Sequence, residues 1–156
     1  MKEICQTLRT LIATALGSSY TVVYGYVKLP AESDLPLISI IPVRTEDSIR
    51  GTGGLRKAIY TITIKATVSI KKYVSTTSGT QIEHANALVE IMEDRNADRT
   101  AKSTSILGVI QANPSISNYV NIANISDIDY QENDPQSYLT SATLTLTAEE
   151  LIPNCA

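Results

Sequence analysis

The sequence contains no tryptophan and no phenylalanine, so its eight tyrosines supply all of the aromatic side chains. Charged residues are also few, at 19%, whereas 43% of the residues are hydrophobic. This balance excludes a disordered tail and a coiled coil, and it is typical of a folded domain. The formal net charge is −3, so the chain lacks the basic surface with which proteins contact nucleic-acid phosphates. We therefore expect no specific binding of nucleic acid.

Cysteine and histidine are scarce. Cys5 and Cys155 lie at opposite ends of the chain, without the spacing of a metal or redox motif. We expect Cys5 to pack as a small hydrophobic residue, and a disulfide with Cys155 is the less favoured alternative. The single histidine, His84, has no serine or cysteine nucleophile motif beside it, so a surface position is favoured over a general base. The sequence thus predicts no metal, no cofactor and no enzymatic activity.

Long hydrophobic runs are missing as well. A membrane-spanning helix needs about 18 or more consecutive apolar residues, and no such run occurs. Polar residues also interrupt the apolar N-terminal segment, unlike the hydrophobic core of a signal peptide; they are Glu3, Gln6, Thr7, Arg9 and Thr10. We expect no membrane partner, a protein that stays in the cytoplasm where it is made, and one domain over residues 1–156.

Three segments have the apolar spacing of helices. Residues 2–16 form an amphipathic pattern that Gly17 ends, as glycine often does just past a helix. A second helix is predicted from about 80 to 96, opened by a capping box at Thr80 and Glu83. Its expected buried residues are Ile82, Ala85, Leu88, Val89, Ile91 and Met92. The charged stretch 93–105 predicts an exposed loop, and residues 106–113 predict a short third helix.

Five segments have the pattern of strands, at residues 21–27, 35–43, 58–73, 119–130 and 138–151. In the segment 58–73, apolar residues from Tyr60 to Ile70 alternate with threonine, serine and lysine. This alternation indicates an antiparallel sheet with one solvent-exposed face. At ~3.3 Å per residue this strand would span roughly 50 Å. That exceeds the width of such a domain, so the strand either bends or projects as an arm. We expect an α+β fold, with an antiparallel sheet of strands of mixed length, a long hairpin, and two main helices on one face.

Smaller features refine this expectation. Gly25 indicates a bulge or a close approach of another backbone segment. The alternation of apolar residues in 119–130 shifts phase near Asn124, which indicates a second bulge. Pro36 and Pro42 belong at strand ends, edges or bulges, because proline cannot donate a ladder hydrogen bond. The segment 131–136 has the composition of a turn.

Two polar clusters were candidates for chemistry. Residues 127–134 are rich in carboxylates, but a calcium loop starting at Asp127 would need glycine and glutamate where Glu132 and Tyr138 stand. Residues 50–57 resemble a phosphate loop, but Lys57 leads into a strand and not a helix. Two interpretations of this second segment remain, a simple hairpin tip or a polar loop that orders against a partner. The partner-binding residues would be Arg44, Arg50, Gly53, Gly54, Arg56 and Lys57.

Taken together, the opening amphipathic helix, the helix 82–94, the segment 106–120 and the strands 120–130 and 138–151 resemble the phage tail terminator family (tail-completion or minor tail proteins). The small-residue pattern that follows the short hydrophobic element in that family is partly kept here, as Ser115, Ser117 and Asn118. The resemblance covers most of the chain.

The resemblance implies a structural virion protein of the tail neck, assembled in the host cytoplasm. It would form a homo-oligomeric ring, usually a hexamer, at the head-proximal end of the tail tube. There it would stop tube polymerisation and provide the docking surface for the head connector. Its partners would be its own copies, the tail tube protein and the connector, with DNA passing through the lumen. The alternatives are a head-completion or connector protein and, in another class, a small-ligand-binding α+β module.

Overall fold

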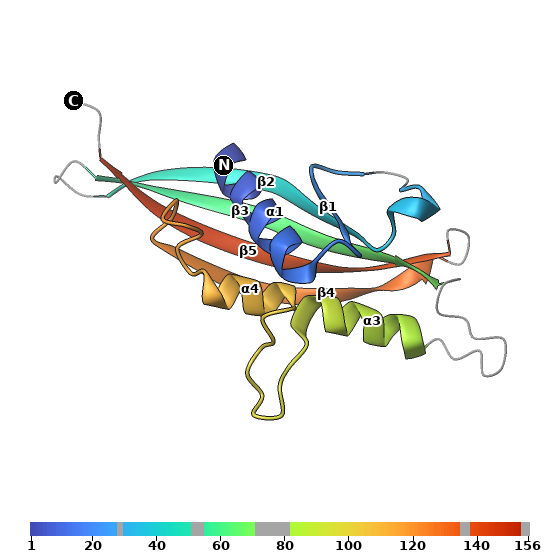
Figure 1. The fold of residues 1–156 in the computed structure, drawn as a ribbon. Helices are drawn as coiled ribbons and strands as arrows, with labels where there is room; N and C mark the ends of the chain where they lie inside the picture. The colour runs from blue at the N-terminus through green and yellow to red at the C-terminus, as the bar shows by residue number, and fades with distance from the viewer. Residues whose placement is uncertain (28–29, 51–54, 71–81, 135–137, 154–156) are drawn as a thin grey trace, which may run out of the picture.

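The computed structural model describes residues 1–27, 30–50, 55–70, 82–134 and 138–153. They form a five-stranded sheet that packs against three α-helices (Figure 1). The elements are α1 (Lys2–Leu16), β1 (Thr21–Tyr24), the 3₁₀ turn η1 (Glu32–Asp34), β2 (Leu37–Arg50), β3 (Leu55–Ser69), α3 (Ile82–Glu93), α4 (Ile106–Ala112), β4 (Ile122–Asp134) and β5 (Leu139–Pro153). The predicted α+β class is confirmed.

The strands lie in the order β1-β2-β3-β5-β4. Neighbours from β2 to β4 are antiparallel, as predicted, but β1 runs parallel to β2. A wholly antiparallel sheet was therefore the wrong expectation. Parallel neighbours need a long connection, and residues 25–36, which include η1, provide it. In consequence β1 and β4 are the two edge strands.

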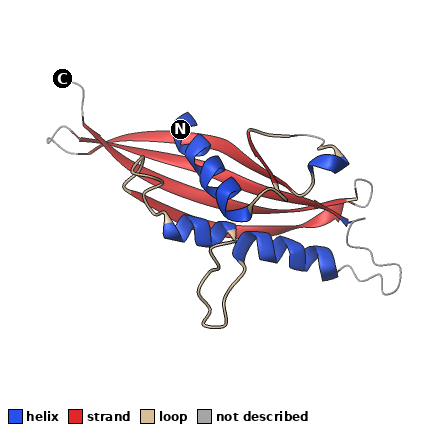
Figure 2. Cartoon of the chain, in the orientation of Figure 1, coloured by secondary structure: helices blue, strands red, loops and turns tan. Residues whose placement is uncertain are grey.

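All three helices lie on one side of the sheet (Figure 2). The core between them holds the predicted apolar face of β3, from Tyr60 to Val68, and Leu144 and Leu146 of β5. Two main helices on a single face and a short third helix were predicted, and α4 is that third helix. The opposite face carries hydroxyl side chains from paired strands, which are buried at Thr67 and Ser141 and half-buried at Thr61, Thr63, Thr143, Thr145 and Thr147.

Strand boundaries differ from the prediction where side chains give little signal. β2 continues to Arg50 and β3 begins at Leu55, because their backbones pair through the polar residues that follow Val43. The predicted extension of β3 to residue 73 lies outside the described residues beyond Ile70. β1 ends at Tyr24, because Gly25 has a φ of 109° and turns the chain.

The bulges fall close to their predicted places. β2 is irregular between Pro42 and Arg44, and β4 between Ile125 and Asp127. Pro36 directly precedes β2, so both prolines occupy the positions expected of them. Residues 131–134 belong to β4 and not to a turn, and the rest of the predicted turn lies outside the described residues.

Two predicted core positions are wrong. Val89 is 40% exposed, whereas Leu88, Ile91 and Met92 of α3 are buried. Tyr138 is 54% exposed, and its φ of 51° turns it out of line with β5. The side chains expected to start α3 and to form its capping box, as well as that of His84, lie outside the described residues.

Cys5 is fully buried, as predicted, and this burial raises the pKa of its thiol to about 11. Cys155 lies outside the described residues. Gly17 follows α1 with a φ of 82°, a conformation that glycine adopts without strain.

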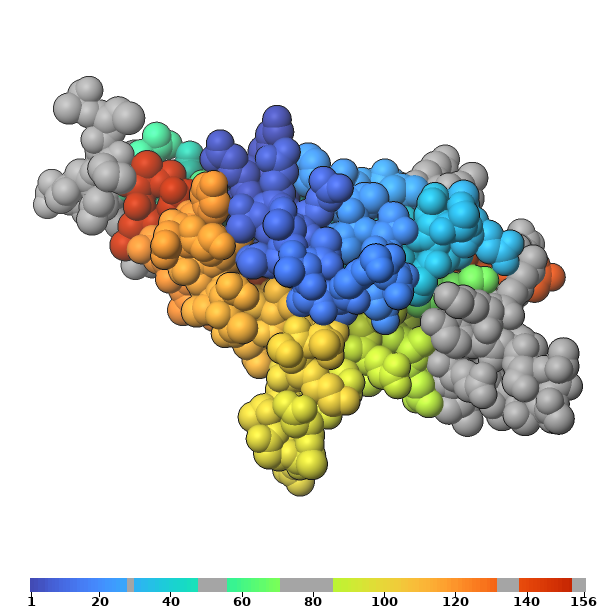
Figure 3. All heavy atoms as spheres, in the orientation of Figure 1, coloured from blue at the N-terminus to red at the C-terminus, as the bar shows by residue number. Residues whose placement is uncertain are grey.

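Helix α3 ends at Glu93, earlier than predicted, because the chain then turns into a hairpin-like loop over residues 94–105. Arg95 and Ala101 form a β-bridge, and the amide of Lys102 donates to the carbonyl of Asp94. This loop protrudes beside α4 in the space-filling view (Figure 3). Ser105 then caps α4, since its Oγ accepts from the amide of Gly108 at 3.2 Å.

Candidate interaction surfaces

The sheet extends beyond the helices at one end, where β2, β3 and β5 continue together (Figure 1). We call this extension the arm; it comprises residues 45–50, 55–59 and 149–153. In its register Asp47 pairs with Ala58, and Ala58 with Glu150. The predicted hairpin is therefore present, and β5 supports it along its second strand.

The arm contains three of the six residues predicted to bind a partner, Arg50, Arg56 and Lys57, and Arg44 directly precedes it. Arg50 ends β2 opposite Leu55, while its side chain and residues Gly53 and Gly54 lie outside the described residues. The other cations form ion pairs within the chain, at 2.7 Å for Arg44 with Glu46, 3.0 Å for Arg56 with Asp47 and 2.6 Å for Lys57 with Glu149. Among the described side chains of the arm, Arg56 and Lys57 are thus each paired with a carboxylate, which does not favour phosphate binding.

A buried tyrosine fixes the base of the arm. The hydroxyl of Tyr60 on β3 donates to the carboxylate of Glu150 on β5 at 2.6 Å. Burial, and then this hydrogen bond, raises the pKa of Tyr60 to about 12. Sequence analysis missed the contact because the two residues are far apart in the chain and only the β3–β5 register brings them together.

A groove of about 550 Å³ lies between α4 and the edge strand β4. We call it the β4 groove. Its lining is mostly apolar and consists of Leu107, Ile110, Gln111 and Pro114 from the α4 side, Ile122, Ala123, Asn124, Ile125 and Ile128 from β4, and Arg95. Ala123, Ile125 and Ile128 also contact the core, so the groove is a place where the core reaches the open edge of the sheet.

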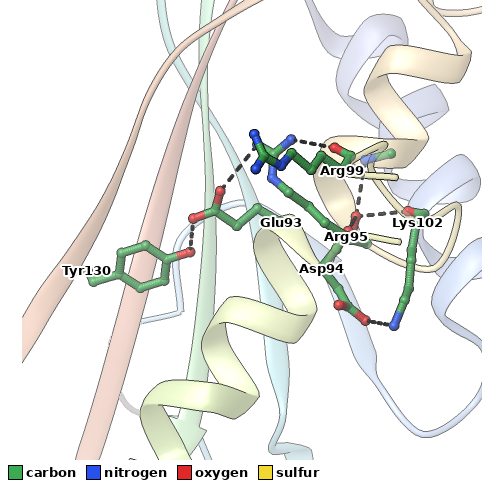
Figure 4. Close-up of polar contacts among 8 residues, drawn as sticks. Glu93, Asp94, Arg95, Arg99, Lys102 and Tyr130 are labelled. Carbon is green, nitrogen blue, oxygen red and sulfur yellow. Dashed lines mark hydrogen bonds and ion pairs between the residues drawn. The ribbon is translucent and has the colours of Figure 1, made fainter. Parts of the chain in front are cut away.

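Polar contacts join the β4 strand to the end of α3 (Figure 4). The hydroxyl of Tyr130 donates to Glu93 at 2.7 Å, and Arg95 pairs with the other oxygen of Glu93 at 3.6 Å. Arg95 also donates to the carbonyl of Arg99 at 3.1 Å. Partial burial, and then the Glu93 carboxylate, raises the pKa of Tyr130. These contacts hold Arg95, the charged residue of the groove lining, in place.

The other edge of the sheet has two parts. The carbonyl of Val22 in β1 is occupied, because Nε of Arg9 donates to it at 3.0 Å. Pairing with β1 ends at Ile40, and no described strand lies beside residues 41–50 of β2 on that side. Val43, at the bulge, is 58% exposed. This edge is therefore capped along β1 and open along the outer half of β2.

The acidic cluster is described at its first part, which carries Asp127 and Asp129. Asp127 and Asp129 are exposed on β4, and among the described residues no group of three or more histidine, cysteine, aspartate or glutamate side chains is placed to hold an ion. Within the same residues no helix is long and apolar enough to cross a membrane. The sequence matches no protein-family model and no curated protein.

Proposed function

We propose that this protein is a structural virion protein that forms a ring at the head-proximal end of a phage tail tube. The ring ends tube polymerisation and offers the docking surface for the head connector. The observation that carries the proposal is the arm, a three-stranded extension of the sheet that projects past the helices and has an open outer strand.

The arm suits a ring because ring protomers bind head to tail, through two different surfaces that close by rotation. A projecting strand on one side of the protomer reaches a neighbour without displacing the core. The ion pairs of Arg56 and Lys57 within the arm, and of Arg44 directly before it, keep the arm soluble before assembly. The hydroxyl-rich sheet face gives a second polar surface that can remain in water or contact the tube.

The β4 groove favours a second candidate, the small-ligand-binding module. Its volume of about 550 Å³ lies within the range of roughly 300–1,000 Å³ that is usual for ligand sites. Its polar residues, Arg95, Gln111 and Asn124, could orient a ligand over the apolar floor. A connector or other neck protein is the alternative within the virion, and it would form rings without ending tube growth.

Electron microscopy with tubes tests the proposal. Tubes polymerised from the tail tube protein of the same virus would be grown with and without the purified chain. We expect a ring on one end of each tube and shorter tubes as the chain concentration rises. Rings that leave tube length unchanged would favour the connector. A chain that neither forms rings nor binds tubes would refute the proposal and favour the ligand module.

A further inference from the structure

The two open edges of the sheet differ in shape. On one side Val43 projects from the bulge of β2, next to a stretch of strand without a described neighbour. Just past β1, Tyr26 is 66% exposed. On the other side β4 is an edge strand along its whole length, and the β4 groove runs beside it. One edge therefore presents a protruding apolar residue and the other an apolar hollow.

Apolar side chains line the β4 edge as well as its groove. Ile122, at the start of β4, is 44% exposed, and Tyr130, eight residues further along the strand, and Val89 on α3 are exposed too. Val89 precedes Glu93 by one helical turn on α3, and so shares the face that contacts Tyr130. Large exposed apolar side chains in a folded monomer mark interaction sites when they gather next to each other. Here Ile122 adjoins the apolar lining of the β4 groove, and Val43 lies on the stretch of β2 that has no described strand beside it.

The charges at the two edges are also complementary. Asp127 and Asp129 on β4 form no ion pair with the described residues. At the opposite edge Arg44 is exposed beside Val43, and its ion pair with Glu46 is exposed too. An exposed pair of this kind is worth little, at about 0–1 kcal/mol. Arg44 can therefore exchange Glu46 for a carboxylate of a second chain at small cost.

We propose that residues 41–50 of β2 in one copy pair with β4 of the next copy, with Val43 seated in the β4 groove and Arg44 facing Asp127 or Asp129. This contact rests on the proposed ring, for which it is the protomer interface. Because the two edges differ, the contact is heterologous, and repeated rotation closes it into a ring. The main-chain hydrogen bonds would supply affinity, and the groove would supply specificity.

The same edges are protected against uncontrolled pairing. Pro42 in β2 has no amide hydrogen to donate, β2 and the edge strand β4 are both bulged, and Arg9 occupies the carbonyl of Val22 on β1. Prolines, bulges and charges are the usual protection of edge strands against aggregation. Arg9 disfavours pairing along β1, whereas Pro42 and the bulge lie within residues 41–50 and restrict the registers in which that segment can pair.

Two single variants, Val43→Asp and Ile122→Asp, test the interface. Each places a charge in one half of the contact, and both sites are exposed enough for the monomer to fold, which circular dichroism would verify. Tyr138→Asp is the matched control, since it changes an equally exposed side chain at the other end of the sheet. We expect each of the two variants to remain monomeric in sedimentation velocity, where the wild type and the control form higher oligomers.

Mixing the two variants gives the decisive result. Each retains one intact edge, so a heterologous contact predicts a one-to-one dimer that grows no further. In a second measurement, Val43→Cys and Ile122→Cys, both in a Cys155→Ser background, should form a mixed disulfide and no disulfide dimers of either variant alone.

Three outcomes would overturn the interface. They are a wild type that stays monomeric at every soluble concentration, variants that still form rings, and a mixture that stays monomeric. Rings that persist in both variants would leave the proposed function standing. In another outcome the wild type forms rings that never bind tubes, and the variants form no rings. That result would refute the proposed function and retain the interface.

Discussion

Replacement of Gly108 by alanine should destabilise the protein, although alanine is the better helix former. Gly108 lies in α4, against the loop that precedes it. A Cβ at this position would be 1.9 Å from the carbonyl oxygen of Lys102 and 3.2 Å from the amide nitrogen of Ser103. Atoms in ordinary contact are about 3.5 Å apart, so the loop backbone must move by roughly 1.5 Å.

The cost follows from what the displaced carbonyl does. It accepts the amide of Ser105 at 3.0 Å and the hydroxyl of Ser105 at 2.8 Å. Loss of these two hydrogen bonds costs about 1 kcal/mol each, and forced packing typically adds about 1–3 kcal/mol. The better helix propensity of alanine stabilises the variant by about 1 kcal/mol. The net expected loss in the free energy of unfolding is about 2–4 kcal/mol.

Thermal and urea unfolding at low protein concentration measure this loss. For a chain of this size, it corresponds to a drop in melting temperature of roughly 4–16 °C. Ala112→Gly, near the end of the same helix, is the control for the intrinsic difference between the two residues. If Gly108→Ala is as stable as the wild type or more so, the close approach of α4 to the loop is wrong.

Three further predictions concern other parts of the fold. Arg9→Gln uncovers the edge carbonyl of β1, so light scattering on heating should show earlier aggregation, and an unchanged onset would refute a protective role. Tyr60→Phe removes the hydrogen bond to Glu150 and should cost about 1 kcal/mol. The raised pKa of Tyr60, about 12 in the fold against an ordinary 10, means that wild-type stability is full below pH 10 and falls as the pH approaches 12. The free energy of unfolding should therefore fall less steeply with pH, between about pH 10 and 12, in Tyr60→Phe than in the wild type. Equal slopes in the two proteins would contradict this. Ser117 has a φ of 56°, so Ser117→Gly should be neutral or stabilising by up to about 1 kcal/mol, whereas Ser115→Gly should destabilise; urea midpoints compare the two.

Much of the fold was predictable because its signals are local. The strict alternation from Tyr60 to Val68 identified the central strand and its buried face, since successive side chains of a strand point to opposite faces. The spacing in residues 2–16 identified α1 in the same way, and that in residues 106–113 identified α4. These patterns depend only on the geometry of a helix or a strand, so a single sequence reveals them.

The candidate interaction surfaces were less predictable. Arg44, Arg56 and Lys57 were identified as a group, but their carboxylate partners come from strand register that the sequence does not state. The β4 groove was missed altogether. Its isoleucines indicated a strand, and nothing local indicated that this strand would lie at the edge of the sheet beside α4.

The sequence by itself determined which segments are helices and strands, which face of β3 is buried and that the chain folds as an α+β domain. Those properties follow from side-chain periodicity and from burial of apolar surface. Only the tertiary structure decided that β1 runs parallel to β2, that the polar residues 45–50 extend a strand, and that β4 is left open at an edge. Backbone hydrogen bonds between strands are nearly independent of the side chains, so strand order and the exact ends of pairing emerge only when the whole sheet is assembled.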